Sequence, residues 1–284
     1  MALPPYAKPH ATPADWVRHL VQRGLIVANP QIAADEIDLV GYERLRIYFT
    51  ARRQTHLAGK PFRPNTSYAD ILQIYECDRQ LRSACFDACG IFEVAFRNSM
   101  SEALTNAHGS HPHKMADAFH NAADRRDAMQ QLATVYAKSK DARARHYMQT
   151  YGDPVLPPFW TIKEFLTFGA SVRLYKLLAN PMKTAIAAAF GLPSHDVFTN
   201  WLECLVDLRN VCAHHDRLFN RTLQKQPARL RRHNLPAAPS NKLKSLLECL
   251  DFMLAQRGLP AATVNRVDQI LQLHPAVQRA EVGY

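Results

Sequence analysis

The sequence predicts an all-α protein, in which a helical bundle follows an N-terminal helical extension. Apolar side chains recur at steps of three and four along most of the 284 residues, which is the period of an amphipathic helix. Only 10 residues are glycine, and the alternating β-branched runs that mark strands are nearly absent. Proline and serine stand where helices are expected to begin.

Three short helices are expected first. Pro13 begins the first helix, and Gly24 follows its last turn. The second helix is expected over residues 30–40, and Gly41 separates it from a third over residues 42–49. The polar segment 52–66 contains two prolines and predicts a loop.

Long helices are expected next. Ser67 and Asp70 form a capping pair before a helix over residues 68–106, in which Gly90 marks a candidate break or bend. Residues 120–150 predict a second long helix, which is more charged and therefore more exposed.

After three closely spaced prolines, the remaining helices are expected over residues 161–179, 181–190, from 194 into the 208–221 segment, 240–257 and 260–273. We expect residues 1–66 to form the extension and residues 67–284 the helical domain, joined in one compact unit because no clear linker separates them.

The composition favours a polyanionic partner. The formal net charge is +10, and nucleic acid is the commonest partner of such a surface. No run of about 18 apolar residues predicts a membrane span, and residues 1–9 lack the apolar core of a signal peptide. The six cysteines form no C-x-x-C pair, so no zinc ribbon is expected. Most of them lie in apolar helical patterns, where a free thiol acts as a small buried apolar group, and a reducing cytoplasm is the consistent compartment.

The segment 208–221, Leu-Arg-Asn-Val-Cys-Ala-His-His-Asp-Arg-Leu-Phe-Asn-Arg, concentrates the reactive side chains. Arg209 offers a planar fork for phosphate oxygens, and the imidazole of His214 can act as a general base or acid. On a regular helix these two residues lie about 140° apart, whereas Asn210 and His214 share a face.

Three arrangements bring Arg209 and His214 together. The helix ends near His214, the long Arg209 side chain swings round, or two chains of a symmetric dimer supply one group each. The alternative is structural: Arg209 pairs with Asp207 or Glu203, or caps a neighbouring helix, while the histidines only pack. Spacing alone leaves these options open.

Five stretches resemble motifs of the Abi-like (abortive infection, AbiD/AbiF-type) branch of the HEPN superfamily of α-helical ribonucleases. Arg209-Asn210-x-x-x-His214 is similar to the R-N-x-x-x-H signature of that superfamily. The stretches are residues 41–48 (G-Y-E-R-L-R-I-Y), 75–82 (Y-E-C-D-R-Q-L-R), 93–97 (E-V-A-F-R), 157–169 (P-P-F-W-T-I-K-E, then F-G) and 208–221.

The resemblance implies a HEPN-like bundle and a phage-defence endoribonuclease that needs no metal or cofactor and leaves a 2′,3′-cyclic phosphate. Arg209 would bind the scissile phosphate, Asn210 would orient it or the imidazole, and His214 would move the proton, with His215 as the alternative base. A homodimer is implied, with RNA as partner and a small non-coding RNA or an antitoxin as further candidates. The rival reading is a non-catalytic RNA-binding or protein-interaction module on the same fold.

Other side chains have two interpretations each. The RNA-binding candidates are Arg217, Arg221, Arg79, Arg82, Arg231 and Arg232. For Arg79 and Arg82 the alternative is an internal salt-bridge network, and for Arg231 and Arg232 a solvated loop. Trp160 is expected to be a core aromatic. The histidines of residues 108–113 are expected to be polar loop residues rather than metal ligands.

Overall fold

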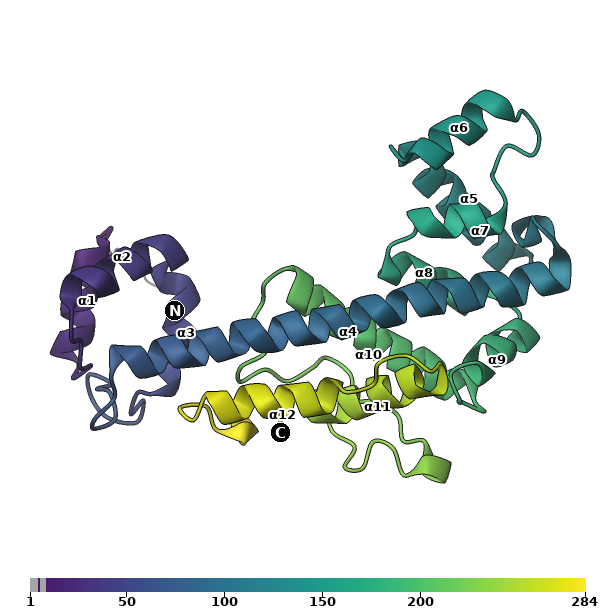
Figure 1. Ribbon diagram of the computed structural model, residues 1–284. Helices are drawn as coiled ribbons and strands as arrows, with labels where there is room; N and C mark the ends of the chain where they lie inside the picture. Colours follow the sequence, from purple (N-terminus) through teal and green to yellow (C-terminus); the bar gives the residue numbers. More distant parts are fainter. Residues whose placement is uncertain (1–4, 6–8) are drawn as a thin grey trace. The chain divides into compact units, whose positions relative to one another are not determined.

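The computed structural model describes residue 5 and residues 9–284, and over these residues it contains helices and loops but no strand (Figure 1). The all-α prediction is confirmed. The expectation that residues 1–9 form no signal peptide falls mostly on residues 1–4 and 6–8, which lie outside the described residues. None of the described helices is both long enough and apolar enough to cross a bilayer.

Contacts divide the chain into two units. The first contains residues Met1–Gln80 and Ile270–Gln278, and the second contains Leu81–Gln269 and Arg279–Tyr284. Each unit is described by itself below. The boundary expected after residue 66 stays a prediction, because units of contact need not be units of folding.

The first unit begins with α1 (Pro13–Gln22), α2 (Pro30–Val40) and α3 (Tyr42–Ala51), close to the predicted ranges. The ring of Trp16 on α1 stacks on that of Tyr42 at 3.7 Å between centroids. The buried Tyr48 hydroxyl donates a hydrogen bond of 2.7 Å to Asp78 at the start of α4 (Tyr68–His108). This bond satisfies a carboxylate that is only 1% exposed.

The predicted capping pair before α4 is present. The Ser67 backbone N–H donates to Asp70 at 2.9 Å, and the Asp70 backbone N–H donates to the Ser67 hydroxyl at 3.1 Å. The helix continues without interruption through Gly90, so the break considered there is wrong.

The core of the second unit is aromatic. Phe92 and Phe96 of α4 meet Phe168 of α8 (Phe168–Leu177) at 6.1 and 6.2 Å between ring centroids. Phe198 of α10 (His195–Ala213) contacts Phe96 at 5.9 Å. Further contacts come from α9 (Asn180–Ala188) and α11 (Leu243–Gln256), which both pack on α10. The chain continues into α12 (Thr263–Leu273).

The six cysteines are free and buried, as predicted. Burial raises the pKa of Cys204 and of Cys77 to about 12, so both thiols are protonated at neutral pH. They act as small apolar side chains.

Two predicted long helices are wrong, because polar residues cap new helices inside them. Residues 120–150 form α5 (Ala122–Lys138) and α6 (Ala142–Thr150), and Asp141 caps α6 by accepting from the Arg143 backbone at 2.8 Å. Residues 159–177 form α7 (Phe159–Ile162), the 3-10 turn η2 (Lys163–Phe165) and α8. Here Thr167 is extended and caps α8.

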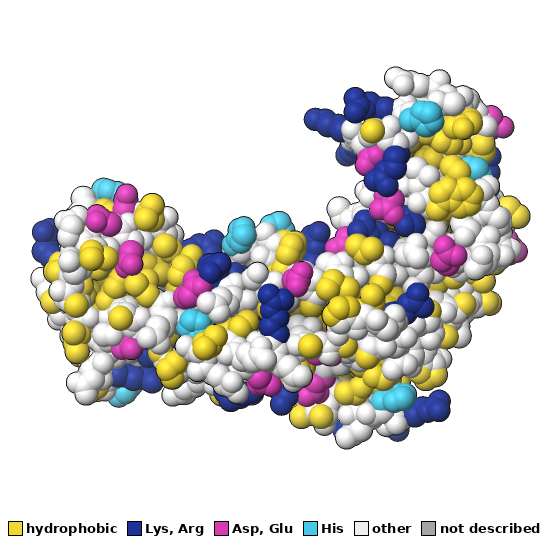
Figure 2. Space-filling model, viewed as in Figure 1, with side chains coloured by type: hydrophobic (Ala, Val, Ile, Leu, Met, Phe, Trp, Pro, Cys, Tyr) yellow, Lys and Arg dark blue, Asp and Glu magenta, His cyan; other side chains and the backbone are white. Residues whose placement is uncertain are grey.

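Trp160 is 51% exposed, so its prediction as a core aromatic is wrong, whereas Tyr48 is buried. The reason is that α7 is a single turn, which buries Phe159 and Ile162 on one side and leaves Trp160 on the other. Figure 2 shows hydrophobic side chains at the surface around α6 and α7.

The histidine-rich segment after α4 contains the 3-10 turn η1 (Pro112–Lys114). His113 is 1% exposed, its ring lies 5.5 Å from that of His111, and both its ring nitrogens are buried without a hydrogen-bond partner among the described residues. The described residues contain no group of three side chains placed to hold a metal ion. Burial lowers the pKa of His113 to about 4, so the ring is neutral when the protein is folded.

His113 predicts a loss of stability in acid. The unfolded ring titrates at its ordinary pKa of 6.5, so below that pH the unfolded state binds the proton that the folded state refuses until about pH 4. We expect the free energy of unfolding to fall by about 2 kcal/mol between pH 7.5 and 5 through this residue. The His113→Phe variant should lose that part of the pH dependence in urea unfolding. The exposed His120→Phe variant should keep it, and an unchanged slope in His113→Phe would contradict the assignment.

Candidate functional site

The C-terminal end of α10 carries the reactive segment. Ser194 caps the start of the helix, and its inner face, which includes Trp201, Leu208 and Cys212, is buried. Because that face is fixed in the core, the remaining positions of the last turns are presented away from it. Asn210, His214 and His215 are exposed.

The helix ends just before His214. The His214 backbone has φ −86° and ψ 7°, and His215 follows with φ 58° in the left-handed region. The His215 and Asp216 N–H groups donate back to the carbonyls of Cys212 at 3.1 Å and Val211 at 2.9 Å. These two bonds form a Schellman motif, in which histidine takes the place where glycine is commonest. The predicted helix end near His214 is therefore present.

An open cavity of about 170 Å³ lies at this helix end. Asn210 and His214 line it together, as their spacing of four predicts. Arg221, from the loop that follows, lines the same cavity and forms a 3.5 Å ion pair with Asp216. An imidazole, an amide and a guanidinium thus face one small open space.

Arg209 lies outside the lining of that cavity. Its Nε is 3.5 Å from the Glu93 carboxylate on α4, and its guanidinium lies over the Phe86 ring at 5.9 Å. The side chain remains 27% exposed. The end of the helix does not by itself bring Arg209 to His214, so side-chain movement and a second chain stay as the two predicted routes.

The ion-pair partner of Arg209 is Glu93, and not Asp207 or Glu203 as the structural alternative predicts. Glu203, one expected partner, is bound instead by Lys176 at 2.6 Å and by Lys225. Glu93 also lies 3.5 Å from Arg97. A part-buried carboxylate on α4 therefore holds two guanidiniums, one on its own helix and one on α10.

Asp207 joins the candidate site, although the sequence predicts it only as a partner for Arg209. It lines the His214 cavity, and burial raises its pKa while Lys225 opposes that shift. The spacing of Asp207, Asn210 and His214, at i, i+3 and i+7, places them on one helix face. This spacing in the sequence is enough to predict that Asp207 lies beside Asn210 and His214.

Some of the RNA-binding candidates bind other groups of the protein, whereas others are exposed on a turn. Arg217 donates to the Phe219 and Asn220 carbonyls at 2.6 and 2.9 Å, which holds the turn after α10. Arg79 pairs with Glu76 on an exposed surface at 2.6 Å. Arg82 is 5% exposed, a position that favours the internal network expected as its alternative. Arg231 and Arg232 are exposed in the 3-10 turn η3 (Arg231–His233).

Comparison with known proteins gives one match. A family model described as Abi-like protein matches residues 37–220, from within α2 to the turn after α10. This range includes Arg209, Asn210 and His214 and ends just before Arg221. No curated protein and no solved structure matched the chain. Proteins of the matched family are associated with abortive infection, a form of phage defence. Because the match extends over well more than half of the sequence, the chain belongs to the Abi-like family.

Proposed function

We propose that this protein is a metal-independent endoribonuclease of the HEPN type that acts in phage defence. The observation that carries the proposal is the open cavity at the end of α10, where the exposed His214 meets Asn210 and Arg221. An imidazole beside a guanidinium is suited to proton transfer on a phosphodiester. The net charge of +10 favours a polyanionic substrate.

In the proposed reaction, His214 takes the proton of a ribose 2′-hydroxyl. The 2′ oxygen then attacks phosphorus and the bond from phosphorus to the 5′ oxygen breaks. The protonated imidazole of His214 returns its proton to the departing 5′ oxygen, so the products are a 2′,3′-cyclic phosphate and a 5′-hydroxyl. Arginine stabilises the charge that develops on the phosphate oxygens, and Asn210 orients His214 or a phosphate oxygen. Arg221 in the cavity and Arg231 and Arg232 on their exposed turn are the proposed contacts to the RNA backbone.

The site is proposed to be composite. Arg209 lies outside the His214 cavity of its own chain, held by Glu93 and Phe86, yet it remains part-exposed. A symmetric homodimer would place the Arg209 of one chain against the His214 of the other. A small non-coding RNA or an antitoxin remains a candidate partner of that dimer.

The second candidate function is a non-catalytic RNA-binding or protein-interaction module. The observation that favours it is the anchoring of Arg209 between a carboxylate and an aromatic ring, which a structural role explains without catalysis. Cleavage assays separate the two functions.

The first test is cleavage of RNA in the presence of EDTA. We expect the His214→Ala variant to lose about a hundredfold or more of the wild-type rate, because the general base is removed. His215→Gly should retain cleavage, since glycine suits the left-handed position at φ 58°. An all-deoxy strand should resist cutting, and its efficient cleavage would refute the 2′-hydroxyl mechanism. Equal cleavage by the wild type and His214→Ala would favour the module.

The composite site predicts complementation. Arg209→Ala and His214→Ala chains, co-expressed with different tags and purified as a mixed dimer, contain one intact site and should regain about half of the wild-type activity. Each variant alone should stay inactive. If the mixed dimer is also inactive while the wild type cleaves RNA, both groups act within one chain and only the composite arrangement is wrong.

A further inference from the structure

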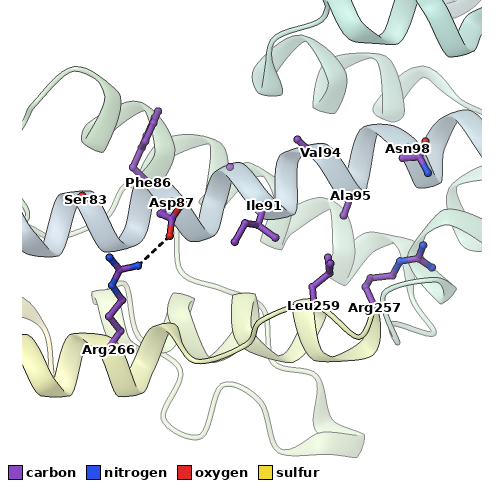
Figure 3. A pocket seen from close by; sticks show the side chains of 11 residues that line it. Ser83, Phe86, Asp87, Ile91, Val94, Ala95, Asn98, Arg257, Leu259 and Arg266 are labelled. Carbon is purple, nitrogen blue, oxygen red and sulfur yellow. Dashed lines mark hydrogen bonds and ion pairs between the residues drawn. The ribbon is translucent and has the colours of Figure 1, made fainter.

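A groove of about 1000 Å³ lies along α4 in the second unit, apart from the His214 cavity. One wall is α4 from Ser83 to Asn98, and the other comes from the end of α11, the loop after it and α12 (Figure 3). Its surface along α4 includes Phe86, Ile91 and Val94. Val94 is 61% exposed and Phe86 44%, so apolar side chains of this wall are open to solvent.

The shape of the groove suits a helix. The α4 wall extends for about 22 Å, which equals four helical turns. Figure 3 shows the two walls running side by side, with Ile91 and Leu259 between them and Phe86 and Val94 on the other side of α4. An added Cβ at Gly90 would meet nothing within 4 Å, so the middle of the α4 wall is open. Long apolar grooves of this kind accept the apolar face of an amphipathic helix.

The charges of the groove indicate which side chains the bound helix carries beside its apolar face. Arg257 and Arg266 stand toward opposite ends of the α11–α12 wall (Figure 3). Arg266 is bound by Asp87 at 3.0 Å. Arg257 lies over the Phe190 ring at 5.7 Å and makes no ion pair with any described residue. The groove therefore presents more positive than negative charge, and it favours acidic side chains along one edge of the helix that it binds.

Charge also argues against two other occupants of the groove, a second copy of the chain and RNA. A second copy that met this groove with its own groove would set arginine against arginine. RNA would satisfy the arginines but would lay a charged backbone over Phe86, Ile91 and Val94. Figure 2 shows this mixture of hydrophobic and Lys or Arg side chains over α4 and α11.

We propose that this groove binds an amphipathic helix of a second protein, with its apolar face on α4 and acidic side chains toward Arg257. The inference does not depend on the nuclease proposal, because no residue of the His214 cavity lines the groove.

The test uses two fluorescent helical peptides of about 16 residues that share a leucine face and differ only in glutamate or lysine on the flank. We expect the full-length protein to bind the glutamate peptide about tenfold more tightly in fluorescence anisotropy. Val94→Asp should weaken that binding about tenfold or more, because a charge enters the apolar surface. Leu39→Asp, at an 85% exposed leucine outside the groove, is the matched control and should change nothing. Arg257→Glu should remove most of the preference for glutamate.

Four results would overturn the proposal. They are equal binding of both peptides, absence of binding to either peptide, displacement of the peptide by single-stranded RNA, and a self-association in sedimentation that Val94→Asp abolishes. Circular dichroism of each variant confirms that a lost signal is not a lost fold.

Discussion

The termination of α10 at Ala213 is the constraint on which the candidate site depends. Two backbone hydrogen bonds donated by His215 and Asp216 close the last turn, and His215, in the left-handed region, turns the chain away from the helix axis. This turn brings Arg221 back to the cavity of His214. If the helix continued through His215, the chain would not turn back here, and Arg221 would not reach the cavity of His214.

The buried face of α10 gives that turn a fixed place. Trp201 and Leu208 are fully buried, and the Trp201 indole donates a 2.7 Å hydrogen bond to the Ala228 carbonyl. This hydrogen bond joins α10 to the loop that supplies Arg221, at a point on α10 that precedes the candidate site. Arg209 depends on a different neighbour, since Glu93 and Phe86 both belong to α4. Arg209 and Arg221, the two arginines proposed to act with His214, are thus positioned by different parts of the fold.

Local chemistry could be predicted from the sequence where it acts over a few residues. The Ser67–Asp70 pair, the cap at Ser194 and the buried face of α10 follow from spacing, and the structure has each of them. Periodicity failed where a cap competed with it, at Asp141 and Thr167, because an apolar pattern does not show where a new helix begins. The Glu93 contact of Arg209 depends on packing between helices distant in sequence, which spacing cannot supply.

Phe86 contacts both the groove along α4 and the side chain of Arg209. Its side chain lines the groove along α4, and the guanidinium of Arg209 lies 5.9 Å from the centre of its ring. A ligand that shifts this ring must also alter the freedom of the arginine, and the two binding events then become thermodynamically linked. Such linkage is reciprocal, so an anion held by Arg209 would change the affinity of the groove by the same factor.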